Sequence, residues 1–201
     1  MPRVVDLARV FVIFLPMAAI GTVSHEMGHI AAARARGYET VLHYGSMNVV
    51  DGWDMNVRDE MLMTVGGPAS NMLIGTVGLL WLAFLRMTSP RAAPMGVAGW
   101  CATVLALFWS RQVFNASGHL MAWVTADVRE SISDEPRLAR MWEVSELITA
   151  GIPCVLGLAV CVAVLVLHSS GQRLTLLLAG PAGCVAGFAL WYGVLGPQLL
   201  P

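Results

Sequence analysis

Long apolar stretches separated by short polar segments run through the 201-residue chain. An α-helix needs about 20 mostly apolar residues to cross a bilayer. Five stretches are candidates, of which the third is the shortest: residues 10–33, 61–85, 95–109, 147–167 and 174–195. The sequence contains no linker long enough to separate two domains. The pattern therefore predicts an all-α polytopic membrane protein with about five transmembrane helices, folded as a single integral membrane domain over residues 1–201.

The segment between the first two stretches, residues 38–60, is too polar to be a span. Apolar side chains such as Val41, Met47 and Val49 recur in it between polar ones, and the pair Asp51-Gly52 follows. Alternation of this kind is typical of strands, and Asp-Gly is a favoured hairpin turn. We therefore expect a short membrane-associated β-hairpin that turns at Asp51-Gly52.

The N-terminus also has features of a secretory signal. Arg3 and Arg9 precede an apolar stretch, and a cleavable signal peptide would end near Ala19. The apolar pattern resumes at residues 30–33 after a brief polar interruption. We therefore expect this segment to be kept as the first membrane span.

The composition supports membrane insertion. Hydrophobic residues make up 57% of the chain and charged residues 12%, whereas about 25% of the residues of a typical soluble domain are charged. The net charge of −1 provides no basic field for phosphate, so we expect the lipid bilayer and no nucleic acid as a partner. Each of the four cysteines lies in an apolar run, which is typical of small core residues and not of a disulfide frame.

The first apolar stretch contains the string HEMGH at residues 25–29. Residues four apart lie on one face of a helix, so His25 and His29 could bind one Zn²⁺ at about 2.1 Å. Glu26 would then be the base that takes a proton from a water molecule on the metal. The alternative is a pair of helix histidines that are hydrogen-bonded to their neighbours.

The position of the motif favours a functional site. His25 lies about 12 Å of helix before Ala33, where the span meets its loop. Ionisable groups at such a depth are costly in hydrocarbon and usually functional. Hydrolysis there needs water, so we expect a cavity lined by protein.

Two further strings accompany this motif. The second apolar stretch contains GPASN at residues 67–71, and a later polar region contains Phe114-Asn115 and, at residues 133–140, SDEPRLAR. Together with residues 25–29, these strings resemble the site-2 protease family of intramembrane zinc metalloproteases. The resemblance covers a catalytic core at about residues 10–145 and leaves the helices at about 147–199 unmatched.

The resemblance implies a function and a set of site residues. Zn²⁺ would be held by His25, His29 and Asp134, and Glu26 would be catalytic. The implied substrate is a membrane protein cut in or next to a transmembrane segment. The implied location is the cell membrane, where a regulatory membrane partner is compatible with the family.

Two asparagines have two interpretations. The family resemblance implies that Asn71 and Asn115 bind the substrate backbone or line the water path. Alternatively, both amides hydrogen-bond between helices, as amides commonly do in membranes.

The third zinc ligand has rivals, because catalytic zinc takes three protein ligands. Asp134 stands before Glu135-Pro136, a helix-start pattern in which it could instead be the N-cap. It nevertheless follows the third span, so its loop lies on the same membrane face as the end of the first span. Asp127 and His119 are the alternatives, and we expect His119 in a loop because it follows Ser117-Gly118.

Other function classes remain open at this stage. A zinc protease of another membrane family would use Glu143 or Glu146 as its third ligand. A non-proteolytic zinc-binding membrane protein, such as a metal carrier or a scaffold, would keep the metal and cleave nothing. Metal content and cleavage activity separate these alternatives.

Overall fold

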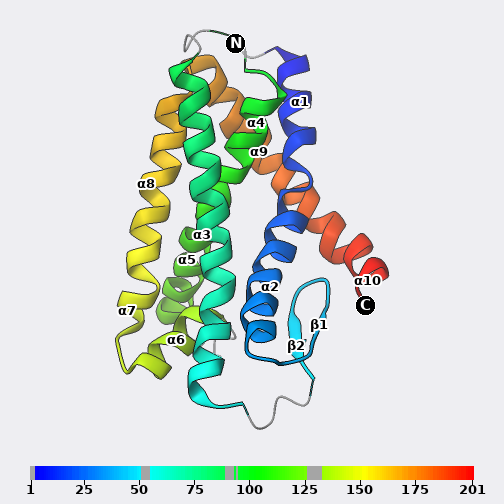
Figure 1. Cartoon of the computed structure of the whole chain (residues 1–201). Helices are drawn as coiled ribbons and strands as arrows, with labels where there is room; N and C mark the ends of the chain where they lie inside the picture. Colours follow the sequence, from blue (N-terminus) through cyan, green and yellow to red (C-terminus); the bar gives the residue numbers. More distant parts are fainter. Residues whose placement is uncertain (1–2, 51–54, 89–92, 94, 126–132) are drawn as a thin grey trace.

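Helices make up nearly all of the fold. The computed structural model describes residues 3–50, 55–88, 93, 95–125 and 133–201. Within them, five helical stretches are long and apolar enough to cross a membrane: Val4–Ala35, Val57–Met87, Val97–Met121, Glu146–Leu167 and Ser170–Leu199. They run along an elongated bundle with a small sheet at one end (Figure 1). The predicted all-α polytopic membrane fold is confirmed.

The first stretch consists of two helices, α1 (Val4–Phe14) and α2 (Met17–Ala35). Pro16 separates them, because proline has no backbone N–H and its ring clashes with the preceding turn of a helix. The break touches the last long helix, since a Cβ on Gly187 would lie 1.8 Å from the carbonyl oxygen of Leu15.

The second stretch is a single helix, α3 (Val57–Met87), whose N-cap Asn56 accepts a hydrogen bond from the backbone amide of Asp59. Helices α2 and α3 cross with their backbones nearly touching. A Cβ on Gly28 would lie 2.2 Å from the carbonyl oxygen of Gly66. The crossing brings the motif of α2 against the middle of α3.

The third stretch is longer than the sequence indicates. It joins α4 (Val97–Ala106), the 3₁₀ turn η2 (Leu107–Trp109) and α5 (Ser110–Thr125). The apolar pattern fades after Trp109, although the helix continues beyond it. His119 therefore lies in α5, and the expectation of a loop at this residue was wrong.

A short helix, α6 (Asp134–Trp142), follows and ends at Glu143, which has a left-handed backbone (φ 54°). The chain then forms α7 (Glu146–Thr149) and α8 (Gly151–Leu167). As expected from the topology, α6 lies at the same end of the bundle as the end of α2 (Figure 1).

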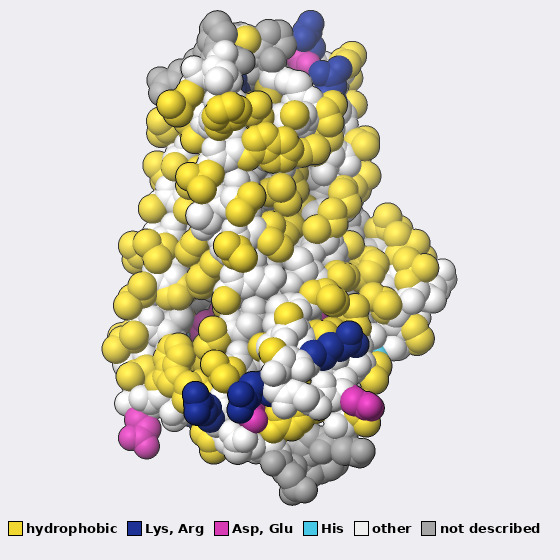
Figure 2. All heavy atoms as spheres, viewed as in Figure 1, with side chains coloured by type: hydrophobic (Ala, Val, Ile, Leu, Met, Phe, Trp, Pro, Cys, Tyr) yellow, Lys and Arg dark blue, Asp and Glu magenta, His cyan; other side chains and the backbone are white. Residues whose placement is uncertain are grey.

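The last stretch contains α9 (Ser170–Leu190), the π-helical turn η3 (Trp191–Leu195) and α10 (Gly196–Leu199). Helix α9 packs along α1. A buried apolar cluster lies between α1, α3, α4, α8 and α9, and includes Val10, Phe14, Leu82, Trp100, Val164 and Leu176. Hydrophobic side chains also cover the sides of the bundle, while the charged side chains on this face gather mostly at its ends (Figure 2). This surface suits a lipid environment.

The predicted hairpin is confirmed, but its turn is elsewhere. Strand β1 (Thr40–Leu42) pairs antiparallel with β2 (Met47–Val49). The chain reverses at residues 43–46, where the backbone amide of His43 donates to the carbonyl oxygen of Ser46 at 2.8 Å. The turn predicted at Asp51-Gly52 was therefore wrong, and those two residues lie outside the described part of the chain. The tip of the hairpin contacts the C-terminal helices, because Trp191 and Leu200 are hydrogen-bonded to Tyr44.

Candidate metal centre

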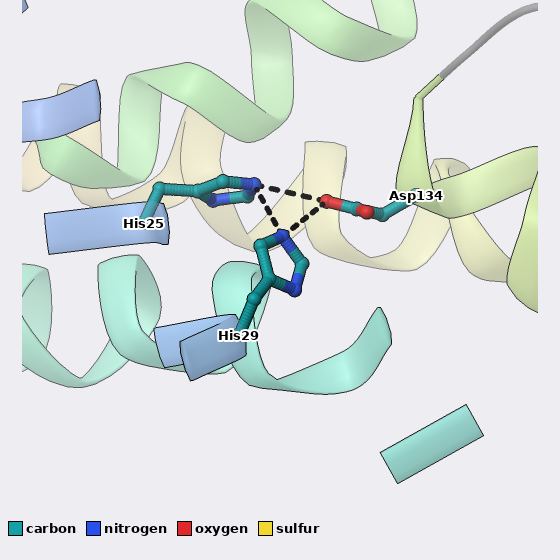
Figure 3. Close-up of side chains that lie close together, drawn as sticks. All are labelled: His25, His29 and Asp134. Carbon is teal, nitrogen blue, oxygen red and sulfur yellow. Dashed lines mark hydrogen bonds and ion pairs between the residues drawn. The ribbon is translucent and has the colours of Figure 1, made fainter. Parts of the chain in front are cut away.

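Three side chains converge at the crossing of α2, α3 and α6 (Figure 3). The Nε2 atoms of His25 and His29 are 3.1 Å apart. The Oδ2 atom of Asp134 lies 2.9 Å from the first nitrogen and 3.5 Å from the second. Ligand atoms about 2.1 Å from one tetrahedral ion are roughly 3.4 Å apart. The triangle therefore has the dimensions of a metal site, and its two imidazoles and one carboxylate are ligands that Zn²⁺ accepts.

The site is enclosed by protein. Both imidazoles are buried, and the side chain of Asp134 is 18% exposed. Gly67 of α3 leaves the space beside them, because a Cβ there would lie 2.2 Å from Nε2 of His29 and 2.7 Å from Nε2 of His25. The glycine of the GPASN string thus allows both nitrogens to face the same point.

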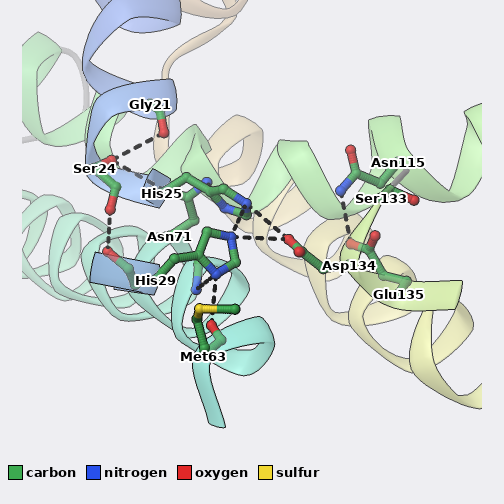
Figure 4. A network of polar contacts seen from close by, with 12 residues as sticks. Gly21, Ser24, His25, His29, Met63, Asn71, Asn115, Ser133, Asp134 and Glu135 are labelled. Atoms are coloured by element: carbon green, nitrogen blue, oxygen red, sulfur yellow. Dashed lines mark hydrogen bonds and ion pairs between the residues drawn. The ribbon is translucent and has the colours of Figure 1, made fainter. Parts of the chain in front are cut away.

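Groups behind the imidazoles orient the rings (Figure 4). Nδ1 of His29 donates to the carbonyl oxygen of Met63 at 2.7 Å. A donor at Nδ1 leaves the lone pair of Nε2 for a metal, which is the usual arrangement behind histidine ligands. The amide of Asn71 lies 3.5 Å from Nδ1 of His25 and accepts a hydrogen bond from Ser24 at 3.3 Å.

Asp134 is the first residue of α6, and the residue at the N-cap position is Ser133. The interpretation of Asp134 as the N-cap was therefore wrong, and its carboxylate points to the histidines. Burial would raise the pKa of this carboxyl group, but the adjacent imidazoles of His25 and His29 outweigh burial and lower the pKa below its ordinary value. Asp134 thus presents an anion at the site.

Helix α6 is fixed from several sides. Asn115 of α5 donates to Oε1 of the buried Glu135 at 2.8 Å, and the hydroxyl of Thr149 donates to the backbone carbonyl of Glu135 at 2.9 Å. Arg137 donates to Glu60 of α3 at 3.0 Å. These bonds attach the start of α6 to α5, α7 and α3, and so place Asp134.

The two asparagines expected at the substrate make contacts between helices. Asn71 joins α3 to α2 beside His25, and Asn115 joins α5 to α6 one residue after Asp134. These contacts agree with the second interpretation of the two asparagines, in which their amides hydrogen-bond between helices.

The rival ligands lie apart from the histidine pair. Nε2 of His119 is 3.0 Å from the hydroxyl of Ser133 and 3.9 Å from Glu135. Glu143 and Glu146 are exposed at the ends of α6 and α7. None of these three joins the metal-binding group found among the described residues. Asp127 lies outside that part of the chain.

Glu26 is buried next to His25, and its carboxyl group faces the backbone of Met47 in β2. A hollow of about 450 Å³ opens beside this strand, lined by Met47, Asn48, Val49, Met55, Glu60, Met63 and Arg137. Met63 also binds His29 through its carbonyl oxygen. The hollow therefore adjoins the candidate metal centre.

Sequence reasoning missed three supporting groups: the Met63 carbonyl, Gly67 as the space beside both rings, and Glu135. A backbone carbonyl leaves no signal in a sequence. Gly67 belongs to the GPASN string and Glu135 follows Asp134 in the sequence, but only the packing of the helices shows what these two residues contact.

Comparisons with known proteins give no family for this chain. No protein-family model, no curated protein and no solved structure matches it. Functional inference therefore depends on the motif and on the geometry of the site.

Proposed function

We propose that the protein is an intramembrane zinc metalloprotease that cleaves other membrane proteins in or next to their transmembrane segments. The buried triangle of His25, His29 and Asp134 carries the proposal, because Glu26 stands beside it on the same helix. The resemblance of residues 25–29 and 67–71 to the site-2 protease family points the same way. We place the protein in the cell membrane, with a membrane-protein substrate.

The roles of the residues follow from their chemistry. His25, His29 and Asp134 would hold Zn²⁺, which lowers the pKa of water to about 7 and polarises a carbonyl group. Glu26 would take the proton from the attacking water and give it to the leaving amine. The carbonyl oxygen of Met63 would keep the imidazole of His29 in the orientation that the ion needs.

The substrate would bind as an extended strand, because a helix hides its peptide bonds. The hydrogen bonds His43 to Ser46 and Val50 to Glu39 fix which residues of the hairpin face each other. In an antiparallel pair, residues whose backbone groups bond the partner strand alternate with residues whose backbone groups point away from it. The backbone amide of Met47 in β2 therefore points away from β1, on the side where Glu26 lies. A peptide added along this edge would lie beside the hollow and the catalytic base.

The deciding experiment is Glu26→Gln in protein reconstituted into liposomes with a panel of labelled single-span peptides. We expect one zinc per wild-type chain and cleavage of at least one peptide. The variant keeps its zinc and loses activity by about 10²- to 10⁴-fold, the usual contribution of a general base. Glu39→Gln, which changes an exposed glutamate, is the matched control and stays active.

Two outcomes contradict this assignment. An active Glu26→Gln variant removes Glu26 from the chemistry. A zinc-loaded wild-type protein that cleaves no peptide favours the metal carrier or scaffold instead.

A further inference from the structure

The tip of the hairpin is held by the C-terminal end of the chain. The indole Nε1 of Trp191 donates to the carbonyl oxygen of Tyr44 at 2.9 Å, and the backbone amide of Tyr44 donates to the carbonyl oxygen of Leu200 at 3.0 Å. Both backbone groups of Tyr44 are thus paired with residues more than 140 positions away. Figure 1 shows the hairpin beside α2, close to the C-terminal helix α10.

The shapes of the two partners also match. A Cβ on Gly196 would lie 2.8 Å from the Cβ of Tyr44, and a Cβ on Gly45 would lie 3.1 Å from the ring of Tyr192. The rings of Tyr44 and Tyr192 meet edge to face, with centroids 5.9 Å apart. We name Trp191, Tyr192, Gly196 and Leu200 the hairpin seat.

The seat is attached to the catalytic helix as well. The hydroxyl groups of Tyr192 and Thr22 are 3.2 Å apart, and Thr22 lies one turn before Glu26 on α2. The π-helical turn at Trp191–Leu195 directs two successive aromatic residues to the hairpin. π-Helical turns are rare in proteins, and those that occur are often found at functional sites. One short segment therefore contacts both the hairpin and the helix that carries the candidate base.

We propose that the hairpin seat sets the position of β2 relative to Glu26, and that Trp191 is a positioning residue for an extended peptide substrate. The inference rests on the proposed function for the identity of the ligand. Strand β2 begins three residues after Tyr44, so a displaced tip moves the edge on which the peptide would pair. The seat touches no metal ligand, and its loss leaves zinc binding intact.

The test uses Trp191→Phe, which keeps an aromatic ring and removes the indole N–H. Hydrogen–deuterium exchange of the full chain in detergent measures the opening of residues 39–50 without any substrate. Loss of this partly buried hydrogen bond predicts exchange about five- to tenfold faster in this segment. In the liposome cleavage assay, KM rises by a similar factor, while kcat and zinc content stay at the wild-type level.

Two further variants keep the result interpretable. Gly196→Ala adds a Cβ against Tyr44, and we expect the same two changes from it. Trp81→Phe removes a partly exposed indole from α3 and changes neither quantity.

The outcomes separate this inference from the proposed function. Unchanged exchange in both seat variants overturns the inference, even if the protein is a protease. Loss of zinc, or a fall in kcat at constant KM, also overturns it, because the seat then acts on the centre and not on the peptide. If the wild-type protein cleaves nothing, the substrate role fails together with the proposed function, while the exchange data still decide whether the seat holds the hairpin.

Discussion

At the scale of single residues, the absence of a side chain at Gly67 makes room for the candidate metal site. Helix α3 passes so close to the rings that any Cβ at this position would overlap both Nε2 atoms. His25 and His29 can face one point only because that space is left open. The requirement is steric, so it can be tested apart from the chemistry of the ligands.

We predict that Gly67→Ala disrupts the candidate metal site. Overpacking of this kind costs about 1–3 kcal/mol, so we expect zinc affinity to fall about 10- to 100-fold, measured by competition with a chromophoric chelator. Gly21→Ala is the matched control, because a Cβ at Gly21 meets no atom within 4 Å. Equal affinities in the two variants would show that Gly67 does not border the ion.

At the scale of elements, the short helix α6 decides whether Asp134 reaches the histidines. Asn115 and Thr149 hydrogen-bond Glu135, the residue after Asp134. These bonds act at the first turn of α6, where a small rotation would move the carboxylate out of the triangle. The position of the third ligand thus depends on packing between helices.

We predict that Asn115→Ala weakens metal binding although Asn115 touches no metal ligand. Removing a direct partner of a metal ligand typically costs about 10- to 100-fold in metal affinity. Asn115 acts one step further away, through Glu135, so we expect a loss of about tenfold or less. The visible spectrum of the Co²⁺-loaded protein reports the coordination geometry and should change with it. Ser117→Ala, an exposed change on the same helix, should behave as wild type. A Co²⁺ spectrum and affinity identical to wild type for Asn115→Ala would exclude a role for this bond in placing Asp134.

At the scale of the whole molecule, the candidate site joins segments that are distant along the chain. His25 of α2 and Asp134 of α6 are 109 residues apart in sequence, and α3 packs between their elements. A bound ion would therefore cross-link the bundle at the end where the hairpin lies. Removing the ion should therefore lower the stability of the whole protein.

We predict that chelation lowers the Tm of the wild-type protein in detergent. A ligand that binds only the folded state at 100 times its Kd adds about 2.7 kcal/mol, so zinc should restore the lost Tm. His25→Ala and Asp134→Ala should respond neither to chelator nor to zinc. A zinc-dependent Tm that persists in both variants would place the ion elsewhere.

Local properties of the sequence determined the membrane spans and the histidine pair. The length of an apolar stretch decides whether a helix can cross a bilayer, and a spacing of four places two side chains on one helical face. The five spans were therefore predictable, as was the approach of His25 and His29. The family resemblance also named Asp134 as the third ligand.

Only the tertiary structure brings Asp134, and none of its described rivals, to the histidine pair, and only it locates the hairpin turn. Contacts with α5, α7 and α3 hold α6, which carries Asp134, and Trp191 and Leu200 are hydrogen-bonded to Tyr44 in the turn at residues 43–46. Such contacts join residues far apart along the chain. Local pattern carries no information about them, because their free energy arises from packing and hydrogen bonds that exist only once the helices have assembled.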